Sequence, residues 1–281
     1  MKKAFQKDQA LLADIRQARS ASSARLWWLG QSGFLIVREG QGILIDPYLS
    51  DSLTIKYAAT DKPHVRISER VVSPEALASV GHLIAVSTSH NHTDHLDAET
   101  LLPVLKGNPQ SRLIIPEANR AFVLDRLGHE LEPRLILLDD ARSVSLDDLQ
   151  ITGVAAAHNE VERDEAGRCK YLGYVFRWAG LTIYHSGDTL RHEGMIPSLR
   201  ALKPDIALLP INGNVPERRV AGNLDGPEAA QLAKDIGAKL VIPCHYDLFE
   251  FNTASTDKFE AACDRLSQPY RVLRLGEGMD L

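Results

Sequence analysis

Short runs of apolar residues recur along the chain and alternate with longer segments in which apolar positions repeat every three or four residues. The short runs are typical of buried strands, and the longer repeats are typical of helices with one buried face. The expected strands cover residues 26–29, 34–37, 43–45, 83–86, 113–115, 135–138, 151–157, 171–178, 181–184, 205–209, 240–242 and 271–275. The expected helices cover residues 4–19, 97–105, 117–127, 227–236 and 256–266. The pattern therefore predicts an α/β protein.

Two segments of the pattern have further consequences. The helix expected at residues 4–19 precedes the strands and packs either across them or against another subunit, which leaves a homo-oligomer open. Residues 48–73 show no strong periodicity and contain Lys56, Lys62, His64 and Arg66. A connection of this length without regular structure is usually functional, so we expect a lid or a binding loop there.

Length and composition exclude several classes of protein. The 281 residues carry a net charge of −5 and contain no linker-like stretch, which favours one domain without the basic stripe of a nucleic-acid binder. Three cysteines provide no disulfide framework, which suits a reducing compartment. No apolar stretch follows the basic start of the chain, and none approaches the ~18 residues of a membrane span. We therefore expect a cytoplasmic protein that acts on a small molecule, with no nucleic acid and no membrane as partner.

Residues 89–95 are the most informative segment, because three imidazoles and one carboxylate fall directly after the strand expected at residues 83–86. Open α/β sheets bind ligands at the carboxyl ends of their strands. His90 and His92 alternate and can point the same way, while Asp94 and His95 can face a second point in space. Imidazole and carboxylate are the usual ligands of divalent transition metals, so the segment suits two adjacent ions better than a solvated polar loop.

Three more expected strands end in histidine or aspartate. His158 follows one of them, His185 and Asp188 follow the next, and Cys244 and His245 follow the third. A single histidine after a strand is more often structural, but the coincidence of several such ends favours a shared metal site. We interpret Cys244 as a small buried residue.

The segment from position 90 to position 95 has the form His-x-His-x-Asp-His, and together with the three later strand ends it resembles the metallo-β-lactamase superfamily of binuclear hydrolases. The resemblance implies an α/β fold of the four-layered αββα sandwich type, with an N-terminal helix at residues 1–24 and a single hydrolase domain at residues 25–281. It also implies two metal sites. His90, His92 and His158 would hold one ion, Asp94, His95 and His245 the second, and Asp188 would bridge both.

Two divalent ions about 3.5–4 Å apart can share a hydroxide that is available near pH ~7. Such a hydroxide attacks lactones, esters, amides, thioesters and phosphodiesters, and the fold does not choose among them. Asp94 would hold a metal and orient the nucleophile, and His185 is either a proton shuttle or a buried structural residue. We expect zinc first, because it suits imidazole, while manganese and iron tolerate the same ligand set.

Several further segments resemble the ascorbate-6-phosphate lactonase branch of that superfamily. They are Trp-Trp-Leu-Gly at residues 27–30, Tyr-His-Ser-Gly-Asp at 184–188, Asp-Ile-Ala-Leu at 205–208, Pro-Ile-Asn-Gly-Asn at 210–214 and Val-Ile-Pro at 241–243. The resemblance favours a small lactone or ester, including a phosphorylated sugar-acid lactone. The candidate contacts to an anionic substrate are Arg191, His192, Arg218 and Arg219, with Asn212 and Asn214 as pocket or turn residues.

Two other functions compete with this reading. The first is a metal-dependent phosphodiesterase, which the acidic balance disfavours for nucleic-acid substrates. The second is a metal-binding or ligand-binding protein without turnover. The complete set of candidate ligands argues against it, since loss of catalysis usually leaves a gap in such a set.

Overall fold

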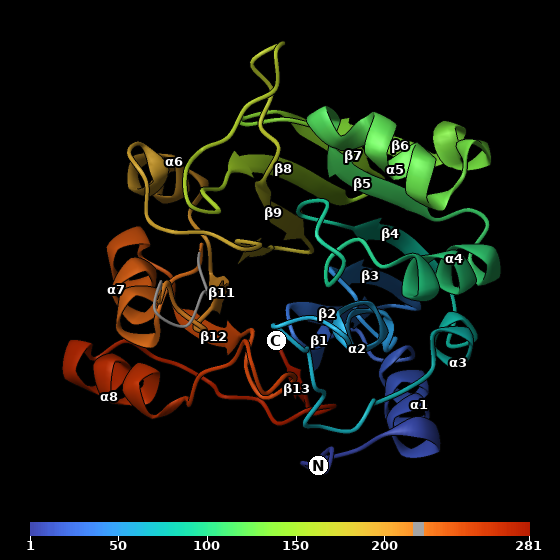
Figure 1. Ribbon diagram of the computed structural model, residues 1–281, viewed down its shortest axis with the longest axis horizontal. Coiled ribbons are helices and arrows are strands. Elements are labelled where there is room, and N and C mark those ends of the chain that lie inside the picture. Colours follow the sequence, from blue (N-terminus) through green and yellow to red (C-terminus); the bar gives the residue numbers. More distant parts are fainter. Residues whose placement is uncertain (216–221) are drawn as a thin grey trace.

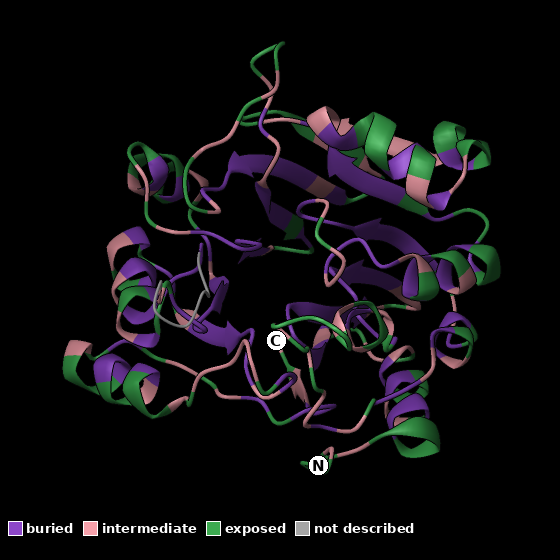
Figure 2. Cartoon of the chain, viewed as in Figure 1, coloured by how far each residue is buried: buried purple, intermediate pink, exposed green. Residues whose placement is uncertain are grey.

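The computed structural model describes residues 1–215 and 222–281 and contains two β-sheets (Figure 1). Helices cover the outer faces of both sheets, so that the layers follow the order helix, sheet, sheet, helix. This is the four-layered αββα arrangement expected from the family resemblance. The strands are buried almost throughout, whereas the helices carry exposed outer faces (Figure 2).

The first sheet has seven strands in the order β13-β1-β2-β3-β4-β5-β6. Its outer part is antiparallel, and its strands from β3 to β6 run parallel. The strands are β1 (Arg25–Gly30), β2 (Gly33–Arg38), β3 (Gln41–Ile45), β4 (Leu83–Ser87), β5 (Arg112–Pro116), β6 (Leu135–Leu138) and β13 (Gly278–Asp280).

The second sheet has six strands in the order β12-β11-β10-β9-β8-β7. The expected hairpin is present, because β9 and β10 pair antiparallel around Ala179 and Gly180. Strands β10, β11 and β12 then run parallel. The strands are β7 (Ser143–Leu146), β8 (Leu149–Ala155), β9 (Leu172–Trp178), β10 (Leu181–His185), β11 (Ile206–Pro210) and β12 (Leu240–Cys244).

The prediction of a strand at residues 271–275 is wrong. This segment forms no strand beyond an isolated bridge between the preceding Tyr270 and Val241, and the last strand is β13, which pairs with β1. The Glu277 carboxylate accepts hydrogen bonds from the side chains of Arg271 and Arg274 and from the Arg274 backbone N–H. A turn at Gly276, where φ is +79°, follows. Bonds to Glu277, together with single backbone bonds to Val241 and Phe5, therefore hold a segment whose apolar pattern alone resembles a strand.

The helices were predicted less completely than the strands. The expected helix at residues 4–19 begins only at Asp8, and short helices α2, α3 and α6 occupy segments where none was expected. The helices are α1 (Asp8–Ala18), α2 (Ser52–Tyr57), α3 (Pro74–Ala78), α4 (Ala98–Gly107), α5 (Arg120–Leu127), α6 (Met195–Leu202), α7 (Gly226–Ile236) and α8 (Asp257–Leu266), with 3₁₀ turns η1 (Glu117–Asn119) and η2 (His129–Arg134). None of the helices within the described residues is long and apolar enough to cross a membrane.

The N-terminal helix packs on the fold of its own chain. Leu11, Leu12 and Ile15 are buried in the main hydrophobic core, together with residues of β1 and β2. Burial of such side chains stabilises a fold by roughly 1.5–3 kcal/mol each. The helix is therefore part of the same core as the strands that precede the candidate metal ligands.

Candidate metal centre

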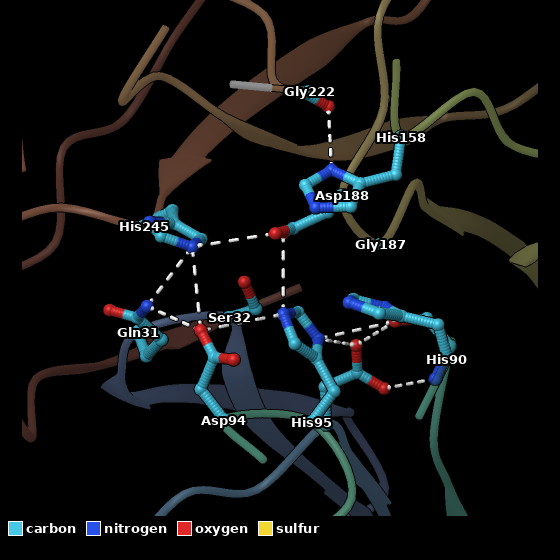
Figure 3. Close-up of polar contacts among 12 residues, drawn as sticks. Gln31, Ser32, His90, Asp94, His95, His158, Gly187, Asp188, Gly222 and His245 are labelled. Atoms are coloured by element: carbon cyan, nitrogen blue, oxygen red, sulfur yellow. Dashed lines mark hydrogen bonds and ion pairs between the residues drawn. The ribbon is translucent and has the colours of Figure 1, made fainter. Parts of the chain in front are cut away.

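The polar residues that were singled out in the sequence follow the carboxyl ends of four strands. Residues 88–95 follow β4, His158 lies just beyond β8, Asp188 follows β10 and His245 follows β12. The ends of these strands from both sheets meet at one edge of the sandwich, where the side chains approach one another (Figure 3).

The segment after β4 forms a tight turn that directs its side chains inward. The backbone N–H groups of His95 and Leu96 both donate to the carbonyl of His92, at 3.1 and 2.8 Å. The turn is fixed to the neighbouring strand because the Asp46 carboxylate accepts hydrogen bonds from the Ser89 N–H and the Ser89 hydroxyl, at 2.8 and 2.5 Å. As a result His90 and His95 are buried side by side, with ring centroids 4.0 Å apart.

Two groups of side chains have the geometry to hold a metal ion, and they share His95. One consists of His90, His95 and Asp188, and the other of Asp94, His95 and His245. Within each group the nitrogen and oxygen atoms available as ligands lie within 4.8 Å of one another. The second group coincides with the set expected for the second ion. The first group contains His90 and the bridging Asp188 as expected, but it has His95 in place of His92 and His158.

Asp188 lies between the two groups. Its Oδ1 is 3.3 Å from Nε2 of His95, and its Oδ2 is 3.5 Å from Nε2 of His245. Burial alone would raise the pKa of Asp188, but His95 and His245 outweigh burial and hold this pKa well below its usual range. The carboxylate is therefore ionised, and it connects the two groups because it forms the first with His90 and faces His245 of the second.

His92 and His158 complete the cluster on the side of His90. The ring of His92 is 4.6 Å from the ring of His90 and 4.9 Å from that of His158. The Nδ1 of His158 lies 3.1 Å from the carbonyl oxygen of Gly222, which leaves its Nε2 for a ligand. All seven candidate ligands thus lie together, although His92 and His158 stand slightly outside the two tight groups.

A glycine at two positions makes this convergence possible. A Cβ on Gly187, where φ is +59°, would lie 2.6 Å from the Cβ of Ser89, so the turn before Asp188 could not approach the β4 loop. A Cβ on Gly222, where φ is +86°, would lie 2.1 Å from Nδ1 of His158. Glycine alone adopts this backbone without strain and leaves this space.

The residues fit a metal centre because several buried polar atoms form no hydrogen bond within the described chain. These atoms include Nε2 of His90, Nε2 of His95 and Oδ1 of Asp188, of which the last two face each other only as an ion pair at 3.3 Å. Unpaired buried polar atoms are costly, so three of them converging on one point indicate a missing ligand. Burial lowers the pKa of His90 well below its usual value, so this ring is neutral, as a metal ligand must be.

Sequence reasoning missed two residues of the centre, Gln31 and Asp46. Gln31 lies in the turn between β1 and β2, and its Nε2 donates to Oδ2 of Asp94 at 2.8 Å and lies 3.0 Å from Nε2 of His245. Asp46 lies immediately after β3, with Oδ2 2.5 Å from Nδ1 of His95. Asp46 follows a strand as the other candidates do, and that position was the signal available in the sequence.

Asp46 orients His95 from behind. A carboxylate on Nδ1 fixes the tautomer that leaves Nε2 free for a metal and raises the basicity of the ring. We expect Asp46→Asn to weaken metal binding by about 10–100-fold, because the amide keeps the shape but loses the charge. The measurement is competition for the metal against a calibrated chelator. Unchanged metal affinity in a folded variant would contradict this role for Asp46.

The other residues proposed from the sequence lie in different surroundings. His185 is buried with Nε2 2.9 Å from the Ser32 carbonyl oxygen, and its Nδ1 accepts the Gly187 N–H. Both ring nitrogens of His185 therefore form hydrogen bonds with backbone groups. This favours a structural role for His185 over a role as a proton shuttle. Arg191 pairs with Asp235 of α7 at 2.7 Å, and His192 has its Nε2 2.9 Å from the carbonyl oxygen of Ala155.

The two asparagines support the loop around the site. Asn212 donates to the side-chain oxygen of Asn252 at 2.8 Å, and Asn214 accepts from the Gly222 N–H. Asn214 thus acts on the segment that holds His158, as a turn residue would. Arg218 and Arg219 lie outside the described residues.

A cavity of about 530 Å³ opens beside the candidate ligands. His92, Asp94, His158 and Asp188 form its floor, so a molecule in the cavity would touch both halves of the cluster. The remaining described lining is Leu53, Lys56, Tyr57, Lys62, His64, Asn91, Thr93, Phe122, Arg126, Asn223, Phe251 and Asn252. The described lining does not include four residues that were expected to contact the substrate, namely Arg191, His192, Asn212 and Asn214. In this structure they therefore do not reach the cavity.

The profile of the β-lactamase superfamily domain matches residues 25–245, which include all seven candidate ligands. The chain belongs to the metallo-β-lactamase superfamily. A protein of Rubrobacter xylanophilus described as a UPF0173 metal-dependent hydrolase is 27% identical over 92% of this chain and 96% of its own length. A protein of Sulfolobus acidocaldarius with the same description is 26% identical over 92% of this chain and 99% of its own length. The chain is accordingly a metal-dependent hydrolase of this superfamily.

Solved structures share the fold. Igni18, a metallo hydrolase of Ignicoccus hospitalis, superposes with a TM-score of 0.64 at 20% identity, covering 92% of this chain and 98% of that one. An isothiocyanate hydrolase from Delia radicum gut bacteria superposes with a TM-score of 0.70 at 20% identity, covering 92% and 99%. These likenesses concern the fold, and the substrate has to be inferred from this chain's own cavity.

Proposed function

We propose that this member of the metallo-β-lactamase superfamily is a binuclear hydrolase that opens a small lactone or ester. The observation that carries the proposal is the placement of Asp188, which forms one ligand group with His90 while its Oδ2 lies 3.5 Å from Nε2 of His245 in the other group. A carboxylate between two ligand groups suits a bridge between two ions better than a single site. When bound, two divalent ions would supply a hydroxide nucleophile near neutral pH and polarise the carbonyl under attack.

The residues of the chain would perform three tasks around that reaction. His90, His95, His245 and Asp188 are buried and hold their ligand atoms rigidly, which fixes the distance between the two groups. Asp94 is ionised because His95 and His245 outweigh the effect of burial on its pKa, and Gln31 donates to it and orients it. Asp94 also lines the cavity, where it can orient the attacking nucleophile towards a bound substrate.

The cavity favours a small substrate. Its volume of about 530 Å³ lies in the range of small-molecule sites, and its floor is formed by the candidate ligands themselves. Lactones and esters place one electrophilic carbonyl close to such a floor. A phosphorylated sugar-acid lactone, as in the lactonase branch that the sequence resembles, is one member of this class.

Metal stoichiometry tests the binuclear proposal. We expect about two divalent ions per chain, zinc first, by elemental analysis of protein purified without added metal. His245→Ala and His90→Ala should each lower the content to about one ion and abolish hydrolysis of a lactone and ester panel. His129→Ala, which changes an exposed histidine away from the cavity, is the control.

The outcomes separate the alternatives. A single ion per chain in fully active protein would refute the binuclear proposal. Two ions with hydrolysis of phosphodiesters but of no lactone or ester would replace the proposed substrate class and leave the metal centre intact. Two ions without hydrolysis of any of these classes would overturn the proposed function.

A further inference from the structure

The outer lining of the cavity, called its mouth below, includes three exposed or half-buried cations, Lys56, Lys62 and Arg126, although the protein as a whole is acidic. Lys56 and Lys62 line the cavity from α2 and the loop that follows it, and Arg126 lines it from α5. Among the described lining residues the only carboxylates are Asp94 and Asp188, which are candidate metal ligands. Three cations therefore line the cavity of a chain whose net charge is −5, and the two lysines among them have no carboxylate partner within the described chain.

The two lysines are available to a ligand. Neither forms an ion pair with a carboxylate of the described chain, and Lys56 lies over the ring of Tyr57, with Nζ 5.2 Å from the ring centroid. A lysine keeps three donors on a flexible stem, so both ammonium groups can follow a bound anion. An ammonium that stays unpaired at a cavity mouth raises the local concentration of anions.

Arg126 has a different role because its guanidinium is already engaged. Its Nη1 donates to the carbonyls of Asn91 and Leu96, each at 3.0 Å, and it stacks over Phe122 at 4.4 Å. Arg126 thus ties α5 to the loop that carries the candidate ligands. Its charge is a fixed part of the cavity wall, whereas the lysines are free to bind.

Aromatic rings flank the charged mouth. The ring of His64 is 4.6 Å from that of Tyr57 and 5.6 Å from that of Phe251, and all three residues line the cavity. Phe122 lines it beside Arg126. Segment 48–73 therefore provides an apolar wall for the body of a substrate and two cations for its end, while the candidate metal ligands form the floor.

We propose that the substrate carries an oxyanion, a phosphate monoester or a carboxylate, remote from the bond that is cleaved, and that Lys56 and Lys62 bind this group. The proposal rests on the proposed hydrolase function and assigns a role to the 48–73 segment. It replaces the contacts predicted for Arg191 and His192, which are engaged elsewhere. Because the anion keeps its place throughout the reaction, the contact exists in both the ground and the transition state and acts chiefly on KM.

The test compares substrates that differ only in the anion. The probes are glucono-1,5-lactone against its 6-phosphate, and phenyl acetate against the monophenyl ester of succinic acid. The variant is Lys56→Gln/Lys62→Gln, and its control is Lys106→Gln/Lys258→Gln, which removes the same charge from two residues that do not line the cavity. We expect the wild type to favour at least one anionic member by about tenfold in kcat/KM, the value of one charge-assisted contact.

The double variant should lose this preference through KM, and the control should keep it. Equal kcat/KM within both pairs in the wild type, or a preference that survives in the double variant, would overturn the anion site. A preference for the phosphate alone or for the carboxylate alone identifies which oxyanion is bound.

Binding of the reaction products keeps this test separate from that of the hydrolase function. The affinity for gluconate 6-phosphate relative to gluconate can be measured by calorimetry even if no probe is hydrolysed. We expect the phosphate to tighten binding by about tenfold in the wild type and the control, and not in the double variant. Tighter binding without hydrolysis would refute the proposed function alone. Equal binding of gluconate and its 6-phosphate, together with equal binding of acetate and succinate, would refute the anion site.

Discussion

Replacing Asp188 by asparagine is expected to reduce turnover by about a thousandfold, which corresponds to roughly 4 kcal/mol of lost transition-state stabilisation. The asparagine retains the shape of the side chain, so the fold should persist. It removes the charge that faces His95 at 3.3 Å and His245 at 3.5 Å, and an amide cannot present a negative oxygen to both groups. The measurement combines kcat/KM with the metal content of the purified variant.

Cys244→Ala is the matched control for Asp188. Cys244 is also fully buried and precedes His245 directly, but burial raises the pKa of its thiol well above the usual value. A protonated thiol is a poor ligand, so this substitution should change turnover by less than about tenfold. Similar losses in both variants, each with its metal content intact, would show that Asp188 acts by packing and would contradict its role as a bridge.

The strands could be predicted because their signal is local. The strand Leu83–Ser87 is apolar up to its last residue and is buried along its whole length, so its neighbours along the chain suffice to identify it. The short helix α3 could not be predicted in this way, since its five residues are too few to show a helical repeat. The segment at residues 271–275 has the composition of a strand, but its side-chain bonds to Glu277 are invisible in the local pattern.

The candidate ligands could be recognised for a related reason. Each candidate ligand follows a strand, and the carboxyl ends of parallel strands lie at the same edge of a sheet. The place of each ligand in the sequence therefore predicted that the ligands lie close together. Asp46 also follows a strand, but its role depends on a contact with His95, which is 49 residues away. The anionic subsite was expected at Arg191, whose ion pair with Asp235 exists only in the folded chain. Lys56 and Lys62 became candidate substrate contacts only because they line the cavity. The periodicity of the sequence does not predict where a cavity lies.

Removal of the metal is expected to abolish hydrolysis and to lower the Tm by about 10 °C. Ions that bind only the native state stabilise it by about 4 kcal/mol when they are present at 1,000 times the dissociation constant. In a chain of 281 residues each kcal/mol shifts the Tm by about 2–4 °C. The measurement is calorimetry before and after dialysis against a chelator, with re-addition of zinc as the control. An unchanged Tm together with complete loss of metal would contradict a structural contribution of the centre.

This difference in Tm should widen as the pH rises from about 6.5 to about 9. Burial alone would lower the pKa of His245, but Asp188 and Asp94 outweigh it and raise this pKa to about 9. A histidine whose pKa is raised by folding stabilises the metal-free protein fully below its unfolded pKa, and this contribution is lost as the pH rises through the folded pKa. Over the same interval His245 must release its proton to bind a metal, so metal binding strengthens.

The two changes are one linked effect, since the metal-free protein loses stability as His245 loses its proton, whereas the metal-loaded protein, in which His245 is already deprotonated, does not. Burial lowers the pKa of His90 and of His92, so these rings titrate below this interval and do not reverse the trend. His245→Ala removes the titrating group and should reduce the widening. A difference in Tm that narrows between pH 6.5 and 9 would show that the metal does not replace a proton at His245, and would separate this histidine from the centre.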